Sequence, residues 1–309
     1  MSSKNSAAAP ASPKPRVYIH VNHKQILGAI VGKYSLEKHS AHADRFDVEF
    51  IEVRNQPFLH AKEGELYLRH GDKRRWLNDD LQSFTPLRFM PPELMGYRGR
   101  AVVIDPDVFA VGDIWELLSR DMDGMALMCR PKSGNKGKGG ALASSVMLLD
   151  CAKLTHWRVE EQFNEMFAFK RDYMDWISLK LEDRSCIGLF EDEWNDFDRL
   201  TPRTQLLHTT KRRHQPWKTG LPIDFRPADK FRLFPPKHWL RRARRAIFGD
   251  YALAGTYKRH PDPAQEAFFF RLVSECLDEG IISEQDIRSE MAHNHVRHDA
   301  LALVRQQAA

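Results

Sequence analysis

Residues 101–109 read AVVIDPDVF, an apolar run that ends in two aspartates on either side of a proline. A continuous run of branched apolar residues predicts a strand buried on both faces, as in a parallel sheet. Pro106 has no N–H group to donate to a sheet, so the strand should end at the aspartates. Ligands bind at the carboxyl ends of strands in open parallel sheets. The stretch therefore predicts an α/β fold with a polar site at this strand end.

The two aspartates of this stretch have the spacing of a metal site. Asp105 and Asp107 should point the same way in extended backbone. Two carboxylates 4 Å apart repel by up to about 4 kcal/mol at an effective dielectric near 20, and a divalent cation such as Mg²⁺ or Mn²⁺ would reverse that sign. The alternative is a solvated turn, and these residues alone leave both interpretations open. The same Asp-x-Asp spacing recurs at 121–123 and 196–198, where we expect turns.

The composition is that of a folded protein without a membrane-spanning segment. The chain has 309 residues, 42% hydrophobic and 29% charged, and no stretch approaches the roughly 20 apolar residues of a transmembrane helix. The four cysteines are far apart and form no CxxC pair, which indicates free thiols and a cytoplasmic location. The formal charge of +5 favours an anionic partner, without saying which kind.

Predicted strands and helices alternate along most of the chain. Strands are expected at 17–21, 46–53, 101–104, 124–130 and 145–149, and helices after Asn22 and at 112–118. Residues 54–84 are polar and should be irregular. Thr85 and Pro86 are typical of a helix start, with the threonine as cap and the proline in the first position. This alternation predicts an α/β domain with a largely parallel sheet.

Composition divides the chain into three parts. Residues 1–15 are small, polar and rich in proline, which predicts a disordered tail. Residues 16–225 form the α/β domain, and residues 226–309 form a basic helical C-terminal region. Within that region, 237–248 combines arginines with large apolar residues and suits a helix lying on an anionic membrane surface. A solvated helix packed on the domain is the alternative, and both stay open.

The order of several blocks resembles the nucleotide-sugar glycosyltransferases of the GT-A fold, specifically glycosyltransferase family 8 and its bacterial relatives. Residues 101–108 and 112–117 are similar to the family's YLDADV…GDI.EL, the most specific match. Residues 17–25 resemble the opening strand and nucleotide loop, and 84–94 the helix before the metal strand. The resemblance implies a GT-A fold with a mostly parallel sheet, followed by a C-terminal helical extension.

The same resemblance implies a metal site and a donor site. Asp105 and Asp107 would bind the metal, and residues 206–218, similar to HxxGxxKPW, would supply His208 as third ligand. A set of two aspartates and one histidine favours Mn²⁺ over Mg²⁺. Asp175 would lie nearest the transferred sugar and serve as catalytic residue. The residues implied to bind the nucleotide-sugar are Val21, Asn22, His23, Arg88, Asp105, Pro106, Ser145, Thr209, Thr210, Lys211 and Lys218.

The chain departs from the family pattern at three places. Asn22 stands where an aspartate is usual, residues 143–145 read Ala-Ser-Ser in place of Asn-Ala-Gly, and Gln215 replaces the lysine that binds phosphate. Any of four nearby cations could replace that lysine: Lys211, Arg212, Arg213 or Lys218. Which one does so stays open.

The resemblance implies a metal-dependent glycosyltransferase, which moves a hexose from a UDP-sugar to a glycan or lipid-linked acceptor with retention of configuration. A catalytically weak homologue that only binds sugar-nucleotides is the first alternative, because of the departures above. A basic module for membrane or nucleic acid is the second, although it accounts for none of the motifs at strand ends. We expect no nucleic-acid partner, and a cytoplasmic protein with peripheral contact to the inner face of the membrane through 237–248.

Overall fold

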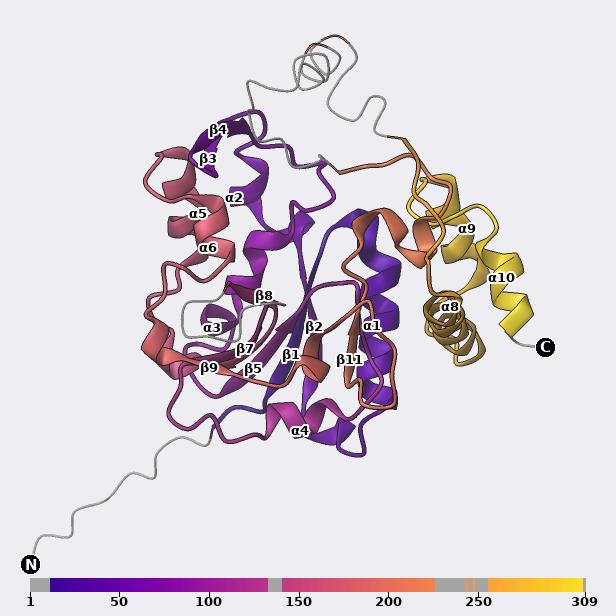
Figure 1. Ribbon diagram of the computed structural model, residues 1–309, viewed down its shortest axis with the longest axis horizontal. Coiled ribbons are helices and arrows are strands. Elements are labelled where there is room, and N and C mark those ends of the chain that lie inside the picture. The colour runs from indigo at the N-terminus through magenta and orange to yellow at the C-terminus, as the bar shows by residue number, and fades with distance from the viewer. Residues whose placement is uncertain (1–11, 133–140, 226–242, 244–246, 248–254, 308–309) are drawn as a thin grey trace, which may run out of the picture.

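A central sheet of six strands organises the fold, in the order β2-β1-β5-β8-β7-β9 (Figure 1). The computed structural model describes residues 12–132, 141–225, 243, 247 and 255–307. The strands are β1 (Arg16–Val21), β2 (Asp47–Glu52), β5 (Arg100–Ile104), β7 (Leu127–Pro131), β8 (Leu142–Asp150) and β9 (Ile187–Leu189). β8 is antiparallel to both of its neighbours, and all other neighbours are parallel. The predicted α/β fold with a mostly parallel sheet is confirmed.

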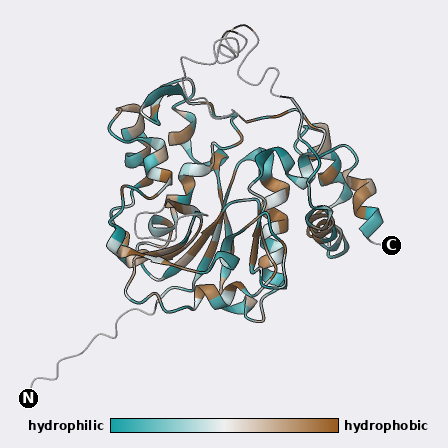
Figure 2. Ribbon diagram, in the orientation of Figure 1, coloured by the Kyte–Doolittle hydropathy of each residue, from teal (hydrophilic) through white to brown (hydrophobic). Residues whose placement is uncertain are grey.

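Strand β5 carries the apolar run that precedes the two aspartates. It lies between β1 and β8, and its residues Val102, Val103 and Ile104 are fully buried. The strand ends at Ile104, as the proline two residues later requires. Figure 2 shows the apolar character of the central strands. Strand β5 therefore places the two aspartates at the edge of the sheet, at the end of a rigid, fully packed strand.

A second sheet of three strands, in the order β10-β11-β6, follows the turn that contains Asp105 and Asp107. This turn is called the metal turn below. Strand β6 (Val108–Ala110) begins directly after Asp107, and it pairs with β11 (Leu206–His208) so that His208 lies opposite Val108. Strand β10 (Asp196–Phe197) pairs with the other side of β11. Sequence reasoning did not predict this sheet, which brings the distant histidine beside the aspartates.

The expectation that residues 54–84 are irregular is wrong. They contain helix α2 (Pro57–His60) and a hairpin of β3 (Leu66–Arg69) and β4 (Asp72–Arg75). The hairpin turn is made by His70 and Gly71, both with positive φ, at 56° and 76°. Such a two-residue turn matches the twist of the flanking strands. A histidine in the first turn position is a weak signal, and the sequence pattern therefore missed the hairpin.

The helices cover the sheets and connect their strands. They are α1 (Ile26–Lys38), α3 (Pro91–Leu94), α4 (Ile114–Leu118), α5 (Val159–Phe167) and α6 (Tyr173–Ile177), with short 3-10 turns η1 (His23–Gln25), η2 (Ala43–Arg45), η3 (Val53–Asn55), η4 (Thr85–Phe89), η5 (Cys151–Lys153), η6 (Arg184–Cys186), η7 (Asp192–Asn195), η8 (Arg212–His214) and η9 (Pro216–Lys218). Thr85 is not the predicted cap, because η4 follows Phe84 and its start has no side-chain cap.

The C-terminal region is helical where it is described, and it packs on the α/β domain. Its helices are α8 (Pro263–Asp278), α9 (Glu284–Ala292) and α10 (Ala300–Gln307), and α8 lies against α1 (Figure 1). Apolar residues of α1 and α8 share one core with Phe109, Leu207 and Trp217. The hydroxyl of Tyr34 donates to Glu279 at 2.7 Å. The C-terminal helices are therefore part of the packed structure around the second sheet.

Several predictions fall partly or wholly outside the described residues. Residues 1–11 of the predicted tail lie there, whereas Lys14 pairs with Asp47 at 2.7 Å and the Pro15 carbonyl accepts from the Asp47 amide at 3.1 Å. The membrane segment 237–248 also lies there, apart from Ala243 and Ile247. Among the described helices, none has the length and apolarity needed to cross a membrane. The four cysteines form no disulfide.

Candidate metal centre

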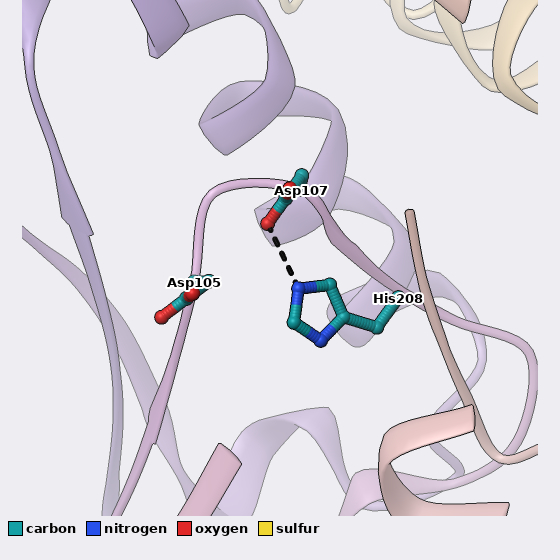
Figure 3. Close-up of side chains that lie close together, drawn as sticks. All are labelled: Asp105, Asp107 and His208. Carbon is teal, nitrogen blue, oxygen red and sulfur yellow. Dashed lines mark ion pairs between the residues drawn. The ribbon is translucent and has the colours of Figure 1, made fainter. Parts of the chain in front are cut away.

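Asp105, Asp107 and His208 converge at the end of β5 (Figure 3). Their ligating atoms all lie within 4.8 Å of one another, and within the described part of the chain no other three such residues come so close. Nε2 of His208 is 3.3 Å from a carboxylate oxygen of Asp107. The metal set expected from the sequence is therefore brought together by the fold.

Asp105 is held by a guanidinium and lies beside a buried imidazole. Arg88 donates to both carboxylate oxygens at 2.8 and 3.1 Å, and its other terminal nitrogen donates to Ser144 at 2.6 Å. Nε2 of His20 is 2.9 Å from the carboxylate, although the angles are not those of a hydrogen bond. Burial alone would raise the pKa of Asp105, but the charge of the Arg88 guanidinium is the largest of the opposing effects and the pKa is lowered to about 2. Asp105 is therefore ionised at neutral pH, whereas burial lowers the pKa of His20 and keeps that ring neutral.

Asp107 is fixed through both its side chain and its backbone. The amide nitrogen of Gln215 donates to its carboxylate at 3.2 Å. Its carbonyl oxygen accepts from the Thr209 amide at 3.1 Å and from the Thr209 hydroxyl at 3.3 Å. Thr209, which directly follows β11, therefore holds the metal turn in place by these two hydrogen bonds. It does not line the cavity beside the metal ligands.

His208 is oriented by a buried amide. Its Nδ1 lies 2.8 Å from the side-chain oxygen of Asn195, whose own nitrogen donates to the Ser145 hydroxyl at 3.0 Å. An amide oxygen can only accept, so Nδ1 carries a proton, and in the neutral ring Nε2 has a free electron pair on the side of Asp107. A hydrogen bond of this kind orients most metal-binding histidines. The network therefore prepares Nε2 of His208 as a ligand atom.

The electrostatics of His208 suit a cation at this position. Burial opposes the charged imidazolium, but Asp107, Asp105 and Asp198 outweigh it and raise the pKa of His208. Asp198 also accepts from the Thr210 hydroxyl and from the Lys211 amide, the latter at 3.1 Å. The carboxylates thus stabilise positive charge beside His208, whether a proton or a metal ion carries it. Two carboxylates and an imidazole fit Mn²⁺ better than Mg²⁺.

A cavity of about 300 Å³ opens beside the three ligands. Four of the predicted donor-binding residues line it: Arg88, Asp105, Ser145 and Thr210. Its further polar lining includes Gln25, Arg69, Gln82, Lys132, Ser144, Tyr173, Arg212 and Gln215. The site therefore combines a cation-binding set with several positively charged side chains.

The opening nucleotide loop has mainly structural contacts. Val21 is fully buried in β1. The amide nitrogen of Asn22 donates to the Leu81 carbonyl at 3.0 Å and to the Ser83 hydroxyl at 3.2 Å, and its oxygen caps the turn that follows. His23 is half-exposed and stacks edge-on against His295. None of the three lines the cavity, nor does Pro106, whose carbonyl faces helix α1.

Lys218, predicted to bind the nucleotide-sugar, is buried and does not line the cavity beside the metal ligands. Lys218 is fully buried and pairs with Asp224 at 2.8 Å, and Tyr257 donates to the other oxygen of that carboxylate at 2.5 Å. Tyr257 belongs to a small apolar core that also contains Leu221 and Ile223. Lys211 is exposed and does not line the cavity either.

Asp175, predicted to lie nearest the transferred sugar, does not line the cavity beside the metal ligands. It lies on α6 with its side chain 41% exposed, and it pairs with Lys180 at 2.7 Å. Tyr173, Met174 and Ile177 face the cavity from the same helix. A residue at position 175 points away from that face because successive helical residues are rotated by about 100°.

Sequence reasoning missed His20, Gln25, Arg69 and Asn195. His20 is a polar residue inside an otherwise apolar strand, which is a usable signal for a residue beside a site. Gln25 is 2% exposed, and its side-chain oxygen has no hydrogen-bond partner. Asn195 ends the sequence LFEDEWN, which resembles a family turn, but its contact to His208 depends on the second sheet.

Several solved structures that resemble this chain are glycosyltransferases. The glycosyltransferase GlyE of Streptococcus pneumoniae matches with a TM-score of 0.47 and 16% identity, over 67% of this chain and 56% of that one. The galactosyltransferase LgtC, in complex with donor and acceptor sugar analogues, matches with a TM-score of 0.46 and 16% identity, over 66% and 89%. The bifunctional glycosyltransferase WbbM matches with a TM-score of 0.43 and 14% identity, over 70% and 49%. No family model and no curated protein sequence matches the chain.

Proposed function

We propose that this protein is a metal-dependent glycosyltransferase of the GT-A type, which transfers a hexose from a UDP-sugar to a glycan or lipid-linked acceptor with retention of configuration. The observation that carries the proposal is the convergence of Asp105, Asp107 and His208 beside a cavity lined with cations. Motif resemblance along residues 17–222 supports the same conclusion independently of the side-chain geometry.

The described residues would divide the work as follows. Asp105, Asp107 and Nε2 of His208 would hold Mn²⁺ or Mg²⁺, which when bound supplies positive charge for a departing nucleoside diphosphate. Arg88 keeps Asp105 ionised and in place through its two hydrogen bonds. Asn195 keeps the proton of His208 on Nδ1. Each of these tasks is done before substrate binds, so the site is preorganised.

The sugar side of the site differs from the family pattern. Ser144 and Ser145 line the cavity where the family has an Ala-Gly pair, and both hydroxyls are already engaged, with Arg88 and Asn195 respectively. Asp175 points away, so we assign it no contact with the sugar. A homologue that binds the sugar-nucleotide and turns it over weakly is therefore the second candidate function.

Nucleotide-sugar turnover tests the proposal. Purified protein is incubated with a panel of UDP-sugars, with and without Mn²⁺, while binding and release of UDP are both measured. We expect binding and hydrolysis or transfer that require Mn²⁺, and loss of both in Asp107→Ala and His208→Ala. The matched control is Asp121→Ala, from an Asp-x-Asp turn in which Asp121 accepts from the amide of Asp123. Metal-dependent binding without turnover would favour the second candidate, and wild-type activity in His208→Ala would exclude the metal assignment.

A further inference from the structure

The cavity beside the metal ligands carries an excess of positive charge. Its lining contains the cations Arg69, Arg88, Lys132 and Arg212 against the two carboxylates Asp105 and Asp107. Arg88 is already bonded to Asp105, so it adds no free charge. A divalent metal ion would make the excess larger still. A ligand that fits this cavity should therefore be a multiply charged anion.

Three of the four cations that the sequence offered for holding this anion do not line the cavity, and position 215 holds no lysine. Gln215 is neutral, buried and bonded to Asp107. Lys218 is buried against Asp224. Lys211 and Arg213 are exposed and do not line the cavity. Of the four cations considered from the sequence, Arg212 alone reaches the cavity wall.

A second guanidinium, that of Arg69, lies near Arg212. Arg69 belongs to the β3–β4 hairpin, which the sequence did not predict. Arg69 lines the same cavity, and its guanidinium lies over the ring of Tyr173 at 4.5 Å and donates to the Tyr67 hydroxyl at 3.2 Å. Its Nε is buried and has no hydrogen-bond partner. The guanidinium of Arg212 lies 5.9 Å from the ring centroid of Phe225. Among the described residues, neither guanidinium has a carboxylate at ion-pair distance.

Two like charges in one cavity raise the free energy of the empty site. Desolvation by burial lowers the pKa of Arg212, and the nearby charge of Arg69 lowers it further. The pKa of Arg69 is raised against its own desolvation, by Tyr173, Tyr67 and Asp80. An anion between them would turn this repulsion into two attractions, and guanidinium groups bind phosphate oxygens in a fork-like geometry. Aromatic contacts hold the groups in place without neutralising them.

We infer that Arg69 and Arg212 together bind the terminal phosphate of the nucleoside diphosphate, replacing the single lysine that Gln215 has displaced. This inference rests on the proposed function, because it takes the nucleotide as the ligand of the cavity. It gives the β3–β4 hairpin a role in substrate binding. It also accounts for how a chain with a neutral residue at position 215 can still hold a diphosphate.

The test compares UDP with UMP, which lacks the terminal phosphate. Dissociation constants are measured by calorimetry in the presence of Mn²⁺ for the wild type, Arg212→Gln and Arg69→Gln. We expect each variant to bind UDP about 10-fold more weakly, as for loss of one charged hydrogen bond, and UMP less than about 3-fold more weakly. The matched controls are Arg213→Gln, beside Arg212 but outside the cavity, and Lys73→Gln, on the same hairpin over the ring of Phe169.

The outcomes separate this inference from the proposed function. Unchanged UDP affinity in both folded variants would overturn the inference, because the anion would then come from another molecule such as a charged acceptor. Equal weakening of UDP and UMP would overturn it too, since the terminal phosphate would not be the group bound. Failure of the wild type to bind UDP with Mn²⁺ would instead overturn the proposed function and this inference with it. Arg212 lies on an exposed turn, so its variant should fold even if Arg69→Gln does not.

Discussion

A β-carbon placed on Gly28 would lie 2.7 Å from the carbonyl oxygen of Pro106. Helix α1 therefore approaches the turn between the two metal-binding aspartates as closely as a glycine allows. We expect Gly28→Ala to displace this turn, to destabilise the fold by about 1–3 kcal/mol and to weaken Mn²⁺ binding. Thermal unfolding and Mn²⁺ titration measure the two effects. Gly32→Ala is the graded comparison, because its β-carbon would lie 3.1 Å from the Val108 carbonyl and alanine gains helix propensity. Equal behaviour of the two variants would contradict the packing argument.

The hydrogen bond from His208 to Asn195 should set metal affinity. Asn195→Leu removes the acceptor for the Nδ1 proton, and we expect Mn²⁺ to bind about 10–100-fold more weakly. Electron paramagnetic resonance of free Mn²⁺ measures this constant. Asn195→Asp keeps an acceptor at the same place, so it should restore most of the affinity. If leucine binds metal as well as asparagine does, the amide has no part in preparing the ligand.

Metal binding should depend on pH through His208. The carboxylates raise the pKa of this imidazole above 6.5, and only the neutral ring can bind a metal ion. The Mn²⁺ affinity should therefore fall about tenfold for each pH unit below the raised pKa and level off above it. Asp105, with a pKa of about 2, stays ionised throughout this range. Affinities measured from pH 5.5 to 8.5 test this, and a flat profile would contradict it.

The stability of the metal-free protein should show the opposite pH dependence. A group whose pKa is raised by folding contributes stability that is complete below its unfolded value and is lost as pH rises through the folded value. His208 should therefore stabilise the metal-free protein more at pH 6 than at pH 8, whereas added Mn²⁺ should stabilise it more at pH 8. Melting temperatures at both values, in the wild type and in His208→Gln, isolate this contribution.

Lys218 should matter for stability and not for nucleotide binding. Lys218→Met leaves Asp224 without its cation, and we expect a loss of roughly 2–3 kcal/mol, below the cost for a fully buried pair because 20% of the Asp224 side chain is exposed. UDP affinity of the folded variant should match the wild type within about twofold. Lys211→Met, at an exposed position of the same segment, is the control. If the variant has normal stability but no longer binds UDP, Lys218 is part of the nucleotide-binding site and the prediction is wrong.

Asp175 should be dispensable for turnover. Its partner Lys180 is 64% exposed, and such surface pairs contribute little to stability. We expect Asp175→Asn to keep its turnover within about twofold of the wild type. The same assay that follows UDP release measures it. A drop comparable to that of Asp107→Ala would mean that α6 turns toward the sugar when substrate binds.

The features that the sequence predicted correctly are those that depend on the local pattern of residues. The strand 101–104 was readable because a short, continuous apolar run rich in valine and isoleucine is typical of a strand buried on both faces. The aspartates were readable because proline ends that strand. The motif order along the chain then pointed to His208, and the geometry confirmed that it lies beside both aspartates.

What the sequence missed depends on contacts between distant segments. Lys218 and Arg212 lie in one basic stretch, yet the first is buried over the ring of Tyr257 and the second lines the cavity. Nothing in their spacing distinguishes the two. That Asp175 points away from the cavity was not readable from the sequence either, because the rotation of α6 is set by what packs against it. The hairpin that carries Arg69 was not predicted, because the sequence of its turn is uncommon in hairpins.

The pairing of β11 with β6 also determines when the proposed metal site can form during protein synthesis. The Thr209 amide reaches the Asp107 carbonyl across 102 residues of sequence, so the metal turn is completed by a segment synthesised long after it. Contacts of such long sequence separation form late in folding because closing the loop is entropically costly. While the chain is still being made, the aspartates are therefore an open pair of carboxylates. Nascent chains that end before residue 206 lack His208, the third ligand of the proposed metal site.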